Sequence, residues 1–262
     1  MPHSSYKFTH ALCRQPGKSV AHGLRAVDGG DPVAQAFLDE HSAYVAALRA
    51  TGATVVVEPA QEDFPDSVFV EDPALCIMGK AIILRPGAPS RFGERDGARA
   101  ALARILGPDN IIDLPEGGLV DGGDILVSGH EVLVGLSART NQAGVDLLRG
   151  IVEPLGLALR VVNTPAHILH FKTGCAILDD TTIFAVQDLA GCFPGYRTIT
   201  CPAGEEPAAN LIRFNDKVFC AKGFPKTRAL LETEGYNVAT LSVTEAAKVD
   251  GGLSCMSLRF SV

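Results

Sequence analysis

The chain has 262 residues, of which 47% are hydrophobic and 20% charged, so it can bury a full hydrophobic core and is not predominantly disordered. Its formal net charge is −7 and no basic block interrupts it, which disfavours a nucleic-acid or anionic-membrane partner. A small cationic ligand fits this charge better.

The N-terminal segment MPHSSYKFTH lacks the apolar core of a signal peptide, and no apolar run approaches the roughly 18 residues of a membrane span. We therefore expect a soluble, cytoplasmic protein. The seven cysteines are scattered and form no C-x-x-C pair, which argues against a disulfide framework and against a zinc site.

An amphipathic helix is predicted over residues 32–49, with Asp31 as its N-cap, Pro32 in its first position and Gly52 beyond its end. Its pattern places His41 on the exposed side. A short strand follows at 54–58, where TVVVE is β-branched and is bounded by glycine and proline.

Pairs of short apolar strands joined by a polar turn then recur along the chain. They read DILVSGHEVLVGL, GCAILDDTTIFAV and NLIRFNDKVFCA, with a longer version, SVFVEDPALCIMGKAIIL, before them. Helices are predicted at 94–106, 141–155 and 226–234, and a last one starts at Ser242, with Glu245 completing a capping box.

A fifth unit can form from the N-terminal strand YKFTHALCR and the C-terminal strand SCMSLRF. A repeat of roughly 50 residues over the whole length predicts a radial or stacked architecture in one closed α/β domain, 1–262. An irregular α/β domain with coincidental hairpins is the alternative.

One cysteine has the setting of a nucleophile. Cys255 follows Asp250, Gly251 and Gly252 at the start of the last apolar strand, where the glycines leave backbone N–H groups accessible. His170 is the better candidate for its base, because polar and glycine residues follow it directly. A buried filler cysteine and a structural histidine are the alternatives.

Carboxylates and arginines interrupt apolar or turn segments. In FPDSVFVEDPAL the acidic residues surround a predicted short strand, and in LVDGGDIL they flank a glycine pair. Two arginines, in RPGAPSR and GLSARTN, suit a carboxylate ligand. These candidates are Asp66, Glu71, Asp72, Asp121, Asp124, Arg91 and Arg139. With the thiol and the histidine they suit an amino acid with a cationic side chain, although each could also be a solvated surface residue.

The motifs DSVFVEDPAL, GGDILVSGHEVLVGLSARTN, LHFKTG and DGGLSCMSLRF, in this order, closely resemble the dimethylarginine dimethylaminohydrolases of the pentein superfamily. The resemblance implies a five-bladed α/β propeller with pseudo-fivefold symmetry. It also implies hydrolysis of asymmetric dimethylarginine and monomethylarginine to L-citrulline, with no metal or organic cofactor, and it leaves room for a homodimer.

The resemblance carries over residue by residue. It implies Cys255 as nucleophile, His170 as catalytic histidine and Asp121 as the carboxylate that orients the histidine. The implied substrate contacts are Glu71 and Asp72 for the guanidinium, Asp66 with the backbone carbonyls of Leu24 and Val249 for the α-amino group, and Arg91 and Arg139 for the carboxylate.

This chain differs from the family pattern at two places, and two related enzyme families offer alternative assignments. Aspartate stands at position 121, where the family also uses glutamate, and the loop 16–32 matches only at its Gly-Leu step, on which Leu24 rests. Arginine deiminases carry H-x-D where this chain has His170-Phe171-Lys172, and agmatine deiminases are rich in tryptophan, of which this chain has none. An arginine deiminase-like hydrolase of the same fold and a non-catalytic arginine-binding module are the alternatives.

Overall fold

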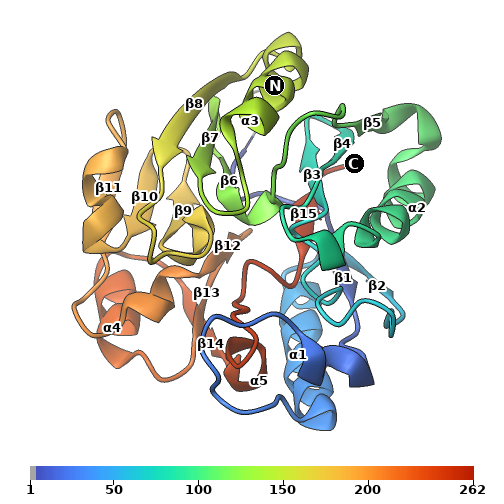
Figure 1. Ribbon diagram of the computed structural model, residues 1–262. Helices are drawn as coiled ribbons and strands as arrows, with labels where there is room; N and C mark the ends of the chain where they lie inside the picture. Colours follow the sequence, from blue (N-terminus) through green and yellow to red (C-terminus); the bar gives the residue numbers. More distant parts are fainter. Residues whose placement is uncertain (1–3) are drawn as a thin grey trace.

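The computed structural model describes residues 4–262, so the first three residues of the predicted domain 1–262 lie outside the described residues. Five three-stranded sheets are arranged in a ring, with helices on its outside (Figure 1). This confirms the predicted α/β class and its fivefold repeat.

Each sheet repeats one topology, in which an antiparallel hairpin is followed by a parallel outer strand. Four sheets are continuous in sequence: β3 (Ala74–Ile77), β4 (Lys80–Ile83) and β5 (Ile111–Asp113); β6 (Ile125–Val127), β7 (Glu131–Leu136) and β8 (Ala158–Asn163); β9 (Cys175–Asp179), β10 (Thr182–Ala185) and β11 (Arg197–Thr200); β12 (Ile212–Phe214), β13 (Lys217–Ala221) and β14 (Val238–Leu241). The first strands of neighbouring sheets contact one another around the middle of the ring, as β9 does with β6 and β12.

The fifth sheet joins the two ends of the chain. Strand β1 (His10–Arg14) pairs antiparallel with β15 (Leu258–Phe260), with His10 opposite Phe260, and parallel with β2 (Thr54–Glu58). This is the predicted pairing of the N- and C-terminal strands, and it closes the ring.

Helices connect the parallel strands of most sheets and cover the outside. They are α1 (Ala34–Arg49), α2 (Glu94–Leu106), α3 (Gln142–Val152), α4 (Pro225–Thr233) and the short α5 (Thr244–Ala247). The apolar face of α3, with Val145, Leu148 and Val152, is buried against strands of the sheets β3–β5 and β6–β8. None of the described helices has the length and apolar character that crossing a bilayer requires.

The predicted start of the first helix is wrong. The helix begins at Ala34, and Val33 is its N-cap with no side-chain cap. Asp31 pairs with Arg25 at 3.1 Å instead, and the Val33 N–H donates to Glu245 Oε2 at 2.6 Å. Glu245, which is distant in sequence, thus accepts a backbone N–H at the start of the helix in place of a local capping side chain.

The predicted capping box of the last helix is wrong for a related reason. Helix α5 has Val243 as its N-cap, and the Ser242 hydroxyl donates to Glu40 Oε1 at 2.6 Å. Glu245 binds Lys248 and the Val33 N–H rather than the backbone of Ser242. Ser242 and Glu245 therefore bind Glu40 of α1 and the Val33 N–H, which precedes α1, instead of forming the predicted capping box with each other.

Two further expectations are corrected. The apolar part of FPDSVFVEDPAL is a series of turns, in which the Phe69 N–H donates to the Asp66 carbonyl at 2.9 Å, and not a strand. His41 is buried, not exposed, and burial lowers its pKa to about 4. Both segments bury side chains against neighbouring elements, which local periodicity does not reveal.

All seven cysteines are free, and five of them are buried. The other two are Cys192 and Cys255, which are partly exposed. The five buried thiols fit the usual behaviour of free cysteine as a small hydrophobic residue of the core.

Candidate active site

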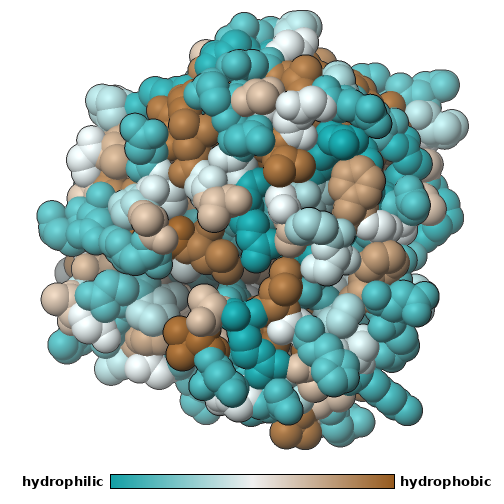
Figure 2. All heavy atoms as spheres, viewed as in Figure 1, coloured by the Kyte–Doolittle hydropathy of each residue, from teal (hydrophilic) through white to brown (hydrophobic). Residues whose placement is uncertain are grey.

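A pocket gathers residues from segments that lie far apart in the sequence. Its lining combines acidic and basic side chains with a thiol and an imidazole, which suits a small charged ligand. Of the predicted site residues, the pocket is lined by Leu24, Asp66, Asp72, Arg91, Arg139, His170, Val249 and Cys255. Asp121 and Glu71 do not line it and lie behind it. Strongly hydrophilic side chains run along the middle of this face of the ring, with hydrophobic ones beside them (Figure 2).

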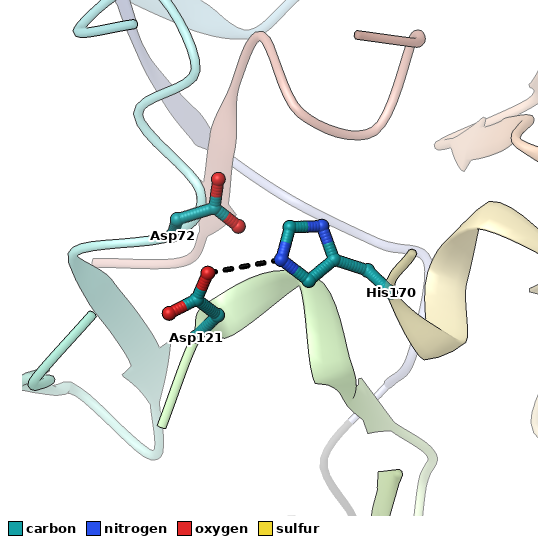
Figure 3. A group of neighbouring side chains, drawn as sticks. All are labelled: Asp72, Asp121 and His170. Carbon is teal, nitrogen blue, oxygen red and sulfur yellow. Dashed lines mark hydrogen bonds and ion pairs between the residues drawn. The ribbon is translucent and has the colours of Figure 1, made fainter. Parts of the chain in front are cut away.

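His170 is held by a buried carboxylate. Its Nε2 lies 2.9 Å from Asp121 Oδ2 (Figure 3), and the Gly87 N–H donates to the other oxygen of Asp121 at 2.6 Å. Asp121 is fully buried, so its short side chain has one available orientation. The ring nitrogen that faces this carboxylate carries a proton, which fixes the orientation of the imidazole.

The charges around His170 favour its protonated form. Burial by itself lowers the pKa of the imidazole, but the charge of Asp72 and the hydrogen bond to Asp121 outweigh it and raise the pKa to about 9. At neutral pH the histidine is therefore a cation that can act as an acid.

Asp72 lies beside Asp121, on the same side of the imidazole (Figure 3). The Gly123 N–H donates to its Oδ1 at 3.0 Å, and Arg91 forms an ion pair with its Oδ2. A Cβ atom at Gly123 would lie 2.8 Å from Asp72 Oδ1 and 2.8 Å from His170 Cγ, so this close approach requires glycine. Arg91 lowers the pKa of Asp72 although burial opposes this, and the carboxylate is ionised.

Asp72, Asp121 and His170 offer ligand atoms within 4.8 Å of one another, which is also close enough for a metal ion. The carboxylates, however, already accept from Arg91, Gly123, Gly87 and His170. This arrangement favours proton transfer and binding of an organic cation over metal coordination.

The two predicted carboxylate-binding arginines differ in their surroundings. Arg91 is buried and donates to Glu94 Oε1 and Oε2 at 3.0 and 2.7 Å, in addition to Asp72. Arg139 is only half-buried, and its guanidinium makes no ion pair or hydrogen bond with the part of the chain that the structure describes. Arg139 is therefore the more available cation for an anionic ligand.

Asp66 lies beneath a loop that covers the pocket. The Leu24 N–H donates to its Oδ1 at 2.9 Å, and burial raises the pKa of this carboxyl. The next turn of the loop is fixed by Ala26, whose N–H donates to Asp250 Oδ2 at 2.6 Å. Asp66, Leu24 and Val249 thus meet at one end of the pocket, as the resemblance implies.

Glu71 lies between two cations. Its Oε1 is 2.6 Å from Lys172 Nζ and accepts from Arg259 Nη2 at 2.7 Å. Its Oε2 is buried and has no hydrogen-bond partner among residues 4–262. Glu71 also borders a second cavity of about 100 Å³, lined mainly by apolar side chains, which includes neither Cys255 nor His170. The predicted contact of Glu71 with a guanidinium stays a prediction, with Oε2 as the acceptor.

Cys255 lies in a turn between α5 and β15. The Glu71 N–H donates to its carbonyl at 3.2 Å, and Arg259 donates to the Ser254 and Ser257 carbonyls, both at 2.9 Å. Burial has the largest effect on the Cys255 thiol, and the charges of Glu71 and Asp72 add to it. Together they raise the pKa of the thiol to about 11. The free protein therefore holds a thiol at neutral pH.

Asp124 holds the histidine side of the pocket together. Its Oδ1 accepts from the Phe171 N–H at 2.8 Å, and its Oδ2 accepts from the Ser137 and Thr140 hydroxyls at 2.6 Å each. The sequence pointed to Asp124 as one of an acidic pair but gave it no role. Glu94 and Arg259 were missed, because nothing local distinguishes them from surface charges.

Comparison with known proteins gives a consistent result. A family model described as "N,N dimethylarginine dimethylhydrolase, eukaryotic" matches residues 28–181. Two proteins named N(G),N(G)-dimethylarginine dimethylaminohydrolase are similar over almost their whole length. The one from Pseudomonas aeruginosa is 38% identical over 97% of this chain and 100% of its own, and the one from Streptomyces coelicolor is 37% identical over 95% and 96%.

Solved structures agree. A Pseudomonas aeruginosa enzyme of this name, in a cysteine-to-serine variant complexed with citrulline, matches with a TM-score of 0.93 over 97% of this chain and 100% of its own, at 38% identity. The N-terminal domain of ArgZ, an arginine dihydrolase from cyanobacteria, matches with a TM-score of 0.84 over 96% and 98% at 17% identity. The second likeness concerns the fold alone.

Proposed function

The chain belongs to the dimethylarginine dimethylaminohydrolase family, and from this premise we propose that it hydrolyses Nω-methylated arginines to L-citrulline and dimethylamine or methylamine. The observation that carries the proposal is the pocket in which Cys255 and His170 meet both carboxylates and guanidinium groups. A relative of 38% identity has been crystallised with citrulline, the product that this reaction would release.

Binding would align the substrate along the pocket. Asp72 and the free Oε2 of Glu71 would accept the guanidinium N–H groups, while Arg139, together with Arg91, would hold the α-carboxylate. Asp66 and the carbonyls of Leu24 and Val249 would hold the α-amino group. Anchoring both ends of the amino acid would place the guanidinium carbon against the sulfur of Cys255.

The first chemical step forms a covalent intermediate. Charge compensation by the bound cation would favour loss of the Cys255 proton to water, since His170 is already protonated. The resulting thiolate attacks the guanidinium carbon and forms a C–S bond. The bond from this carbon to the methylated nitrogen then breaks, and His170 gives its proton to the departing amine. The substrate remains on Cys255 as a thiouronium, and Asp121 stabilises the orientation of the imidazole throughout.

The second step is hydrolysis. His170, now neutral, takes a proton from a water molecule that attacks the thiouronium carbon. The C–S bond breaks, the electron pair returns to the sulfur, and L-citrulline leaves. The protein residues supply each of these proton transfers, so the mechanism requires no metal or organic cofactor.

The test is formation of the ureido product, measured side by side with asymmetric dimethylarginine, monomethylarginine, arginine and agmatine; this product is citrulline for the three amino acids and N-carbamoylputrescine for agmatine. We expect the methylated amino acids to react fastest. If arginine reacts faster than both, the chain is an arginine deiminase-like hydrolase of the same fold. If none releases citrulline although dimethylarginine binds in calorimetry, the site is a non-catalytic arginine-binding module.

We also propose that residues 1–262 form one domain, and that the protein acts in the cytoplasm as a homodimer on a small molecule, without nucleic-acid or membrane partners. The net charge of −7 supports the last point. Light scattering after size-exclusion chromatography tests the assembly, and a monomer at micromolar concentration contradicts it.

A further inference from the structure

The side chain of Asn210 touches the sulfur of the proposed nucleophile. Asn210 directly follows a 3₁₀ turn (Glu206–Ala209) and precedes β12, so it reaches the pocket from a different sheet than Cys255 does. Its Nδ2 lies 3.8 Å from Cys255 Sγ, and the residue is only 8% exposed. Neither the sequence motifs nor the mechanism above uses this contact.

The orientation of the amide is fixed by its surroundings. The Ser254 N–H lies 2.9 Å from the amide oxygen Oδ1. A backbone N–H can only donate, so the atom that faces it must be the oxygen, and the NH₂ group must then face the sulfur. Asn210 therefore offers a donor to Cys255.

Gly252 makes room for this amide. A Cβ atom at Gly252 would lie 2.5 Å from Asn210 Cγ and 2.7 Å from Asn210 Nδ2. Any side chain at this position would push the amide away from the sulfur. The second glycine of the DGG motif is thus explained by the contact between Asn210 and Cys255.

A further donor would help the sulfur to ionise. Burial and the charges of Glu71 and Asp72 oppose ionisation of Cys255, and they outweigh the hydrogen bonds from the Gly252 backbone and the Ser254 hydroxyl that favour it. Among the side chains of residues 4–262, the sulfur makes hydrogen-bond contacts only with Asn210 and with the Ser254 hydroxyl, at 3.9 Å. The hydroxyl can rotate to other acceptors, whereas the amide is held in place.

We propose that Asn210 is a further catalytic residue, which stabilises the Cys255 thiolate by donating a hydrogen bond from Nδ2 to Sγ. This role rests on the proposed function, in which the thiolate attacks the substrate and is regenerated when citrulline leaves. The contact is long in the free protein, and catalytic hydrogen bonds commonly tighten when the substrate is bound.

Two variants of Asn210 test the contact without any substrate. Asn210→Asp keeps an oxygen for the Ser254 N–H but replaces the donor by an acceptor, and Asn210→Ala removes both. The rate of Cys255 alkylation by iodoacetamide is measured against pH, and the labelled residue is identified by mass spectrometry. A hydrogen bond to a charged group predicts alkylation about tenfold slower at neutral pH for Asn210→Ala, and slower still for Asn210→Asp, with both profiles shifted to higher pH.

Asn163→Asp is the matched control, because it makes the same change of charge at an exposed position at the end of β8. Its alkylation profile should equal that of the wild type. If the profiles of folded Asn210→Ala and Asn210→Asp also equal the wild type, Asn210 does not stabilise the thiolate. A residue with only a structural role would lower thermal stability and leave the profile unchanged.

A measurement on the wild type covers the case in which the variants do not fold. The side-chain NH₂ resonances of Asn210, assigned by amino-acid-selective ¹⁵N labelling, should titrate together with the Cys255 thiol. No shift across that titration overturns the proposal. The alkylation assay needs no turnover, so it separates this proposal from the proposed function. If the wild type hydrolyses no methylarginine but the alkylation profiles of the two variants are shifted, only the proposed function is refuted.

Discussion

The two sides of the pocket respond in opposite ways to the same negative charge. On the histidine side, Asp72 and Asp121 stabilise the imidazolium, and the pKa of His170 is about 9. On the cysteine side, burial and the charges of Glu71 and Asp72 destabilise the thiolate, and the pKa of Cys255 is about 11. Both groups are therefore protonated in the free protein at neutral pH. A cationic ligand would offset these carboxylates and favour the thiolate, so the charge of the proposed substrate would itself contribute to activating Cys255.

The largest effect is expected on the cysteine side. Cys255→Ser replaces the thiol by a hydroxyl that ionises much less readily, and kcat should fall on the order of 10⁴-fold or more. Dissociation constants for dimethylarginine from calorimetry should change little, because the charged anchors remain. Near-normal citrulline release by this variant would rule out covalent catalysis by the thiol.

On the histidine side, Asp121→Asn removes a charge from the hydrogen bond to His170. The pKa of the imidazole should fall and kcat should drop about 10²-fold, with KM nearly unchanged. Steady-state kinetics and NMR titration of His170 measure both quantities. Asp188→Asn is the control, because it alters an exposed histidine–carboxylate pair in which His167 Nε2 lies 3.1 Å from Asp188 Oδ2. Equal kinetics for the two variants would contradict the role of Asp121.

The histidine side should also make stability depend on pH. The pKa of His170 is raised from 6.5 to about 9 in the folded protein, so its contribution is complete below pH 6.5 and is lost as pH rises through about 9. The difference in unfolding free energy between the wild type and His170→Asn should shrink by about 2–3 kcal/mol between about pH 6 and pH 10. Urea unfolding at the two pH values measures it, and a constant difference would show that the imidazolium is not favoured.

The smallest effect is expected at Arg139, which lines the same pocket as Cys255 and His170. Arg139→Ala should raise KM for dimethylarginine about tenfold and leave kcat nearly unchanged, because an exposed ion pair to the carboxylate contributes mainly to binding. Agmatine, which lacks this carboxylate, should be unaffected by the change. Arg228→Ala, in an exposed pair with Glu232 on α4, is the control. An unchanged KM for dimethylarginine would mean that Arg139 does not hold the carboxylate.

Patterns with local causes were predictable from the sequence. The hairpins that surround Asn215 and the turn at 128–130 follow from turn residues between apolar strands, and α2 has the predicted bounds. The failures concern partners that are distant in the chain. Asp31 has a residue type that favours an N-cap, but in the structure it pairs with Arg25. The burial of His41 depends on elements that only the tertiary structure brings together.

The candidate site shows the same division. Cys255 and His170 stand in motifs whose glycines and polar residues are typical of a catalytic site. Both were therefore predicted from the residues themselves as well as from the family resemblance. Glu94 and Arg259 stand in ordinary helical or strand sequence, and only the fold reveals that Glu94 is buried against Arg91 and that Arg259, partly buried, pairs with Glu71. Buried charges of this kind cannot be told from surface ones before the partner is known.

Closure of the ring by β15 also sets the moment at which reactivity can arise. During synthesis on the ribosome, His170 and its carboxylates leave the exit tunnel well before Cys255, which precedes β15 by only a short turn. A chain made only as far as His170 would therefore lack both Cys255 and the strand that closes the ring. The proposed nucleophile is thus the last residue of the candidate site to be made.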